Sequence, residues 1–125
     1  MSDAVYIIDG ARTPMGGLMG ELSTFSAVNL GEVAIRSAQE KSNLSGDDID
    51  EVIMGCVLPS GLRQGPARQA AIDAGIPDSV GATTINKLCG SGMKSVMLSH
   101  DLIRAGTNQV MAVSYTHLRA HETVS

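Results

Sequence analysis

The segment with the clearest chemical potential runs from Asn86 to Ser95 and reads NKLCGSGMKS. It places Cys89 directly after a β-branched run and before two glycines that open a helical pattern. The first turn of a helix offers unsatisfied N–H groups and the positive end of the helix dipole, and both favour a thiolate. Gly90 and Gly92 let a substrate approach the backbone closely. The pattern favours a nucleophilic cysteine whose own N–H could face a developing oxyanion.

Other interpretations of this segment fit less well. A dinucleotide fingerprint needs a third small residue and an acidic residue about 20 positions later, and both are lacking. A phosphate-binding loop is excluded because Met93 separates Gly92 from Lys94. A free cysteine is often a small buried hydrophobe, and the spacing alone leaves that alternative open for Cys89. For Cys56, inside the apolar run VIMGCVL, we expect this inert, buried state.

The histidines predict no metal site. His117 and His121 have the spacing of a helical zinc pair, but Glu122 follows the second histidine, whereas the zincin motif has its glutamate after the first. No third ligand is in view. His100 lies inside a predicted helix, where we expect a packing or surface role.

The elements that must position Cys89 alternate between strands and helices. Short apolar runs predict four strands, and caps with helical periodicity predict three helices between them. The expected order is β-α-β-α-β-α-β, an α/β fold with a mostly parallel sheet covered by helices. The strands are expected at 5–9, 52–58, 83–86 and 109–112, and the helices at 26–41, 66–75 and 90–104. The third helix carries apolar residues on more than one face, so it requires cover on most sides.

Composition narrows the class of protein. The 125 residues fit one domain, and 43% hydrophobic with 18% charged residues is typical of a globular protein. The net charge of −4 and the lack of a basic cluster argue against a nucleic-acid partner. No apolar run is long enough to predict a membrane span. Two cysteines and a first segment unlike a secretory signal predict a cytoplasmic protein.

The last thirteen residues, VSYTHLRAHETVS, differ in character from the rest. They contain two of the three histidines and continue no periodic pattern. The run resembles a translated sequencing adapter. We therefore expect a native domain over residues 1–112 and a non-native tail over residues 113–125.

Three segments of the sequence resemble the thiolase family. They are VYIIDGARTPMGG near the start, DEVIMGCVLPSGLRQGPARQAAIDAGIP in the middle, and INKLCGSGMKSV around Cys89. The resemblance covers residues 1–112 and places Cys89 at the position of the acylated cysteine. It implies a duplicated fold of two βαβαβαββ halves, with the cysteine helix buried between two sheets. Arg12, Thr13 and Pro14 match the family, and we expect them to position the chain.

The resemblance also implies a reaction, ping-pong acyl transfer between coenzyme A and acyl-CoA, used in fatty acid metabolism. Coenzyme A would be a substrate, not a permanently bound cofactor. A histidine base and a second cysteine would come from a part of the family fold that these residues do not include, so we expect this chain to be inactive alone. The full-length protein is expected to be a homodimer or homotetramer. Two alternatives remain: a ketoacyl synthase-like condensing enzyme and a non-catalytic remnant.

Overall fold

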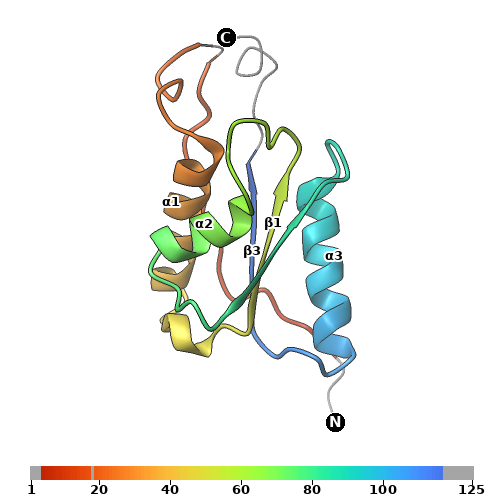
Figure 1. The fold of residues 1–125 in the computed structure, drawn as a ribbon. Coiled ribbons are helices and arrows are strands. Elements are labelled where there is room, and N and C mark those ends of the chain that lie inside the picture. Colours follow the sequence, from red (N-terminus) through yellow and green to blue (C-terminus); the bar gives the residue numbers. More distant parts are fainter. Residues whose placement is uncertain (1–3, 18, 117–125) are drawn as a thin grey trace.

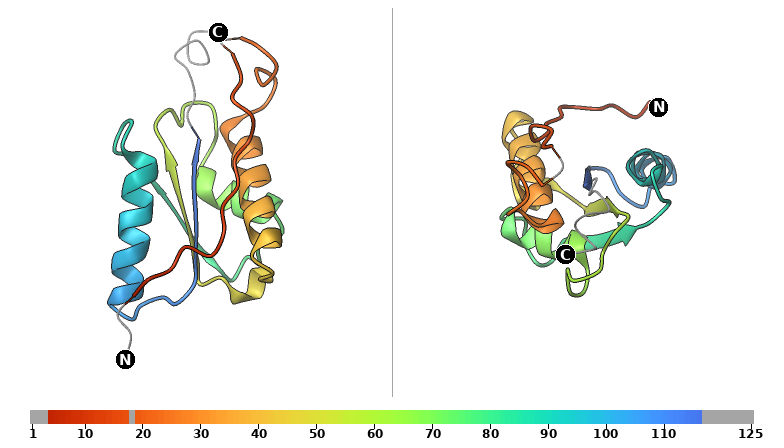
Figure 2. Two further views of the ribbon diagram at one scale, coloured as in Figure 1. Left: turned by 180° about the vertical axis from the view of Figure 1, so that it is seen from behind. Right: turned by 90° about the horizontal axis from the view of Figure 1, so that it is seen from above.

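The computed structural model describes residues 4–17 and 19–116 as three layers (Figure 1). A parallel sheet forms the middle layer, helices α1 and α2 cover one face, and α3 covers the other (Figure 2). This confirms the predicted α/β class. The elements are α1 (Ala27–Lys41), a 3-10 turn (Gly46–Asp48), β1 (Glu51–Cys56), α2 (Pro66–Asp73), β2 (Gly81–Ile85), α3 (Ser91–Arg104) and β3 (Met111–Thr116).

The strand order is β2-β1-β3, and both pairings are parallel. Glu51 at the start of β1 pairs with Gly81 on one side and Met111 on the other. The central strand β1 is buried along nearly its whole length, which explains its continuous apolar sequence. Because all three strands run the same way, their carboxyl ends meet at one edge of the sheet. Cys89 follows the carboxyl end of β2 at that edge.

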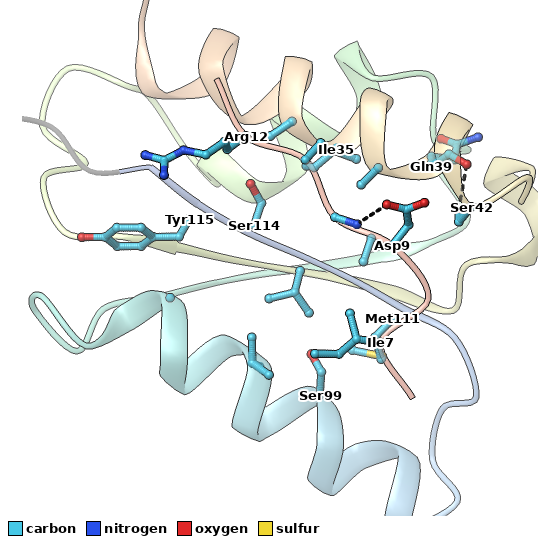
Figure 3. A pocket seen from close by; sticks show the side chains of 18 of the residues that line it. Ile7, Asp9, Arg12, Ile35, Gln39, Ser42, Ser99, Met111, Ser114 and Tyr115 are labelled. Carbon is cyan, nitrogen blue, oxygen red and sulfur yellow. Dashed lines mark hydrogen bonds between the residues drawn. The ribbon is translucent and has the colours of Figure 1, made fainter. Parts of the chain in front are cut away.

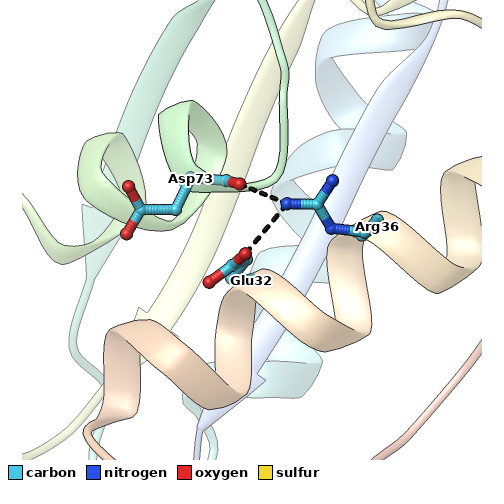
Figure 4. A network of polar contacts seen from close by, with 3 residues as sticks. All are labelled: Glu32, Arg36 and Asp73. Carbon is cyan, nitrogen blue, oxygen red and sulfur yellow. Dashed lines mark hydrogen bonds and ion pairs between the residues drawn. The ribbon is translucent and has the colours of Figure 1, made fainter.

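The helix ends follow local rules that the sequence displays. Ser26 caps α1 through a capping box with Asn29, with each side chain bonded to the other residue's backbone N–H. Pro66 occupies the first turn of α2. After α3, Gly106 adopts a left-handed φ of 81°. Arg36 then ties α1 to α2, because its guanidinium binds both the Glu32 carboxylate and the Asp73 carbonyl (Figure 4).

The two faces of the sheet are packed differently. The core cluster lies between the sheet and the pair α1 and α2, and it consists of medium and small apolar side chains that include Val28, Val52, Met54 and Ala70. On the other face, α3 packs against β1 and β3 through serines: Ser91, Ser95 and Ser99 are its buried residues. Of the apolar side chains of α3, Met93, Val96 and Met97 are exposed and none is fully buried.

The predicted first strand, Val5–Asp9, is not formed. Residues 5–17 belong to no strand of the described sheet, and Tyr6, Ile7 and Ile8 are exposed. The segment runs past β3 toward α1 and does not pair with β3 (Figure 2). A strand needs a neighbour for its backbone N–H and C=O groups, and apolar residues alone do not supply one. The described order is therefore α-β-α-β-α-β, with three strands.

The last strand is longer than predicted and crosses the expected domain boundary. The sequence predicts it at 109–112, but it runs over Met111–Thr116, so the first four residues of the expected tail pair with β1. Thr116 also donates to the carbonyl of Ala27 at 3.1 Å. Residues 117–125 of that tail lie outside the described residues, and the non-native origin of residues 113–125 stays a prediction.

The start of β3 is fixed by the carboxylate of Asp50. Its Oδ2 accepts hydrogen bonds from the N–H groups of Gln109 (2.7 Å) and Val110 (2.9 Å), and these bonds hold the pKa of Asp50 below its ordinary value. A depressed folded-state pKa contributes stability above the unfolded-state pKa, and this contribution is lost as the pH falls through the folded value. We expect Asp50→Ala to lower the free energy of unfolding by about 1 kcal/mol at pH 7, since the site is exposed.

Urea unfolding of both proteins at pH 7 and pH 3 measures this effect. The difference between them should begin to shrink as the pH falls below the unfolded-state pKa of Asp50, because the contribution of its lowered folded-state pKa is then progressively lost. A difference that is the same at both pH values would show that the charge of Asp50 contributes nothing.

Candidate active site

Cys89 lies where the sequence predicts it, between the end of β2 and the first turn of α3. Gly90 is the N-cap residue, and the helix begins at Ser91. The thiol of Cys89 is exposed. A nucleophile at this position stands beside the N–H groups of the first helical turn and is open to a ligand from solvent.

The turn that carries Cys89 has an unusual backbone. Leu88 adopts a left-handed φ of 51°, a conformation that costs a bulky L-residue roughly 1–2 kcal/mol. Side-chain hydrogen bonds surround it. The Leu88 N–H donates to Asn86 Oδ1 (2.9 Å), and the Ser91 hydroxyl donates to the Leu88 carbonyl (2.6 Å). Sequence reasoning missed Asn86 and Ser91. Asparagine and serine side chains favour turns because they form hydrogen bonds with nearby backbone groups. These two residue types near Cys89 were the signal in the sequence that indicated the turn.

Gly55 of β1 brings α3 close to the sheet at this point. A Cβ atom at Gly55 would lie 2.9 Å from the carbonyl carbon of Ser91, which is backbone. It would also lie 2.9 Å from the Tyr115 ring. The absence of a side chain in the middle of the sheet thus allows the first turn of α3 to approach β1. Sequence reasoning missed this contact because it joins residues far apart in the chain.

The second cysteine is buried, as predicted. Cys56 ends β1 and is 1% exposed. Burial raises the pKa of its thiol, while a backbone hydrogen bond with Leu58 acts in the opposite direction. A buried thiol that resists ionisation is a poor nucleophile. The thiol of Cys89 is therefore accessible to solvent, whereas the thiol of Cys56 is not.

Tyr115 lies near both cysteines, on β3. Its ring packs on Gly92, where a Cβ atom would lie 3.0 Å from the ring. Burial raises the pKa of Tyr115, and the charges of Cys89 and Cys56 raise it further. The Tyr115 phenol and the two thiols therefore all lie at the edge of the sheet where the carboxyl ends of the strands meet.

The other candidate residues lie apart from Cys89. His100 is on α3, exposed, and paired with the neighbouring Asp101 at 3.1 Å. It is the one histidine among residues 4–17 and 19–116, so the described part of the chain places no imidazole at the thiol. Within that part, no group of three or more metal-ligating side chains forms. His117, His121 and Glu122 lie outside it.

A cavity of about 990 Å³ lies between the amino-terminal segment and the sheet (Figure 3). Its walls are residues 5–17, the inner side of α1, one side of α3, and β3. Arg12, Thr13 and Pro14 belong to this wall, so they line the space beside β3. Cys89 is not among the lining residues. The cavity separates residues 5–17 from the edge of β3, and it does not enclose the thiol of Cys89.

The sequence is similar to known proteins along most of its length. A family model described as the thiolase N-terminal domain matches residues 5–115. The chain is 52% identical over 105 residues to the probable acetyl-CoA acetyltransferase of Mycolicibacterium smegmatis. It is 50% identical over 107 residues to acetyl-CoA acetyltransferase 2 of Arabidopsis thaliana. The two matches cover 84% and 86% of this chain but 27% of each relative.

A solved structure shares the fold. The Acat5 thiolase from Ascaris suum, crystallised in complex with coenzyme A, superimposes with a TM-score of 0.81 at 40% identity. The match covers 82% of this chain and 27% of the Ascaris chain. The chain thus spans about a quarter of the length of the proteins it resembles.

Proposed function

The chain belongs to the thiolase family, and from that membership we propose that Cys89 is the residue acylated in a coenzyme A-dependent acyltransferase. The observation that carries the proposal is the position of an exposed thiol in the turn between β2 and the N-cap of α3. A helix N-terminus stabilises developing negative charge, and Gly90 and Gly92 leave room for a thioester. Membership in the family supports a thiolase over a ketoacyl synthase-like enzyme.

The proposed reaction has two steps. The Cys89 thiolate attacks the carbonyl carbon of an acyl-CoA thioester, the C–S bond to coenzyme A breaks, and coenzyme A leaves as a thiol after taking a proton. In condensation, the α-carbon of a second acyl-CoA loses a proton and attacks the acyl carbonyl, and the Cys89 thiolate leaves. In thiolysis, Cys89 instead attacks the keto carbon of a 3-ketoacyl-CoA, the bond from that carbon to the α-carbon breaks, and an acyl-CoA leaves with a proton added at its α-carbon. Coenzyme A then takes the acyl group from Cys89. The names of the relatives in M. smegmatis and A. thaliana favour acetyl as the transferred group. Coenzyme A is thus a substrate, in keeping with its presence in the complex of the Ascaris thiolase.

The two steps need groups that the described residues do not bring to Cys89. The resemblance assigns a histidine base and a second cysteine to other parts of the family fold, and His100 is placed far along α3. We propose that the 125-residue chain alone performs no thiolysis and that the whole enzyme is a homodimer or homotetramer. We also propose a cytoplasmic location. A cytosolic relative in Gibberella zeae supports it, although a Xenopus tropicalis relative is mitochondrial. Among the described residues no helix is long and apolar enough to cross a membrane.

A chimaera tests the proposal. Residues 5–112 replace the matching segment of the full-length M. smegmatis relative, and thiolysis of acetoacetyl-CoA is followed. We expect turnover by the chimaera, none by the 125-residue chain, and a loss of at least about a thousandfold in kcat for Cys89→Ala. Cys56→Ala is the matched control and should retain most activity.

The outcomes separate the alternatives. A folded chimaera that keeps its activity after Cys89→Ala would refute the assignment of the nucleophile. A folded chimaera with no activity would favour the non-catalytic alternative. Turnover by the 125-residue chain itself would show that the groups missing around Cys89 are not required.

A further inference from the structure

Residues 87–89 form a turn before α3, and the side chains of Asn86 and Ser91 bind its backbone. The left-handed backbone of Leu88 lies at its centre, and the Leu88 side chain is 69% exposed. A bulky L-residue does not adopt such a backbone without support from its surroundings. Hydrogen bonds around the turn supply this support. The Gly90 N–H donates to the Lys87 carbonyl and the Ser91 N–H to the Leu88 carbonyl, and side chains add further bonds.

Ser91 supplies two of these bonds from inside the protein. Its side chain is fully buried at 0% exposure. The hydroxyl oxygen accepts from the Lys87 N–H at 2.7 Å, and the hydroxyl proton is donated to the Leu88 carbonyl at 2.6 Å. One hydroxyl thus spans the turn and satisfies both its donor and its acceptor capacity.

The second of these bonds acts on the peptide unit that joins Leu88 to Cys89. The Leu88 carbonyl and the Cys89 N–H belong to one planar peptide unit, so holding the carbonyl sets the direction of the N–H. The Cα atom of Cys89 belongs to the same unit, so its position is set as well. Asn86 adds a brace from the other side: its Oδ1 accepts from the Leu88 N–H at 2.9 Å, and its Nδ2 donates to the Val57 carbonyl beyond β1 at 3.2 Å.

The geometry points to Ser91 and Asn86 as positioning residues that hold the turn before Cys89 and so present its thiol to the acyl donor. This inference rests on the proposed role of Cys89 as nucleophile. Neither side chain needs to touch the substrate. Their effect is to keep the reacting atoms in a near-attack geometry, which a small displacement would spoil.

The helix itself contains matched controls. Ser95 and Ser99 are also buried, on the same face of α3 as Ser91. Their hydroxyls donate to helical carbonyls, Ser95 to Ser91 at 2.8 Å and Ser99 to Ser95 at 2.9 Å. Ser95→Ala therefore removes a buried hydroxyl from the same interface and leaves the turn intact.

The experiment uses the full 125-residue chain at submicromolar concentration. Acetylation of Cys89 by p-nitrophenyl acetate is followed by mass spectrometry, which requires neither the base nor the second cysteine. We expect Ser91→Ala to slow acetylation about tenfold and Ser95→Ala to change it less than about twofold. Asn86→Ala should slow it by an intermediate factor. Equal effects of Ser91→Ala and Ser95→Ala would overturn the inference.

A spectroscopic measurement tests the inference independently of the proposed function. The carbon-13 shifts of Leu88 report its backbone conformation, and they should leave the left-handed range in Ser91→Ala but stay there in Ser95→Ala. In the unaltered chain, the Lys87 and Leu88 amides should exchange at least about tenfold more slowly than unstructured amides. Exchange at the unstructured rate would refute the role of the turn, even if Ser91→Ala failed to fold. A failure of the chimaera to turn over would leave these readouts unchanged.

Discussion

In the native 125-residue chain, Cys89 will react with iodoacetamide at least about a hundredfold faster than Cys56. The Cys89 thiol is exposed at the surface, so the reagent reaches it without any opening of the fold. The Cys56 thiol is 1% exposed at the end of the central strand, and its burial raises its pKa. Alkylation of Cys56 therefore waits for a local or global opening, whose population is small in a folded domain.

Peptide mapping after a short pulse of reagent at neutral pH measures the two rates together. The control is the same chain in concentrated urea, where both cysteines should label at similar rates because neither is buried. Comparable labelling in the folded chain would mean either that β1 opens readily or that Cys89 is covered. Hydrogen exchange of the β1 amides distinguishes the two cases, because an open strand loses its protection.

Replacing two methionines on α3 will convert an associating chain into a monomer. Met93, Val96 and Met97 are 74%, 46% and 50% exposed, and the last two lie one turn after Met93, so the three form one outward stripe. Full burial of such side chains stabilises by roughly 1.5–3 kcal/mol each, so the stripe favours association by several kcal/mol. Exposed apolar patches of this kind mark surfaces that another element or molecule covers. The resemblance to thiolases assigns that cover to a second half of the fold.

The test compares the wild-type chain with the double variant Met93→Lys and Met97→Glu by sedimentation at increasing concentration. We expect the wild-type chain to form larger species and the variant to remain monomeric. Ile72→Gln on α2 is the matched control, since Ile72 is 43% exposed but belongs to no such stripe. It should leave association unchanged. A wild-type chain that stays monomeric at high micromolar concentration would show that the stripe is tolerated in water.

Local features of the sequence determined the parts of the fold that depend on neighbouring residues. The cap at Ser26, the proline at Pro66 and the glycine at Gly106 act through bonds within one or two turns, and the structure confirms all three. The continuous apolar run around Met54 predicted a strand buried on both faces. The order of strand, cysteine and glycines predicted where Cys89 would lie, because each of these elements starts or ends by local chemistry.

Tertiary structure decided what each element packs against. The run Val5–Asp9 predicted a strand, but it pairs with no strand of the described sheet, because a cavity lies between it and the edge strand β3. The pattern of α3 showed several apolar faces, yet the sheet takes the serine face, because Gly55 allows an approach so close that only small side chains fit. The turn at Leu88 depends in part on a hydroxyl that is buried once α3 rests on β1. Periodicity shows which residues can be buried, whereas close approach between distant segments fixes which residues are.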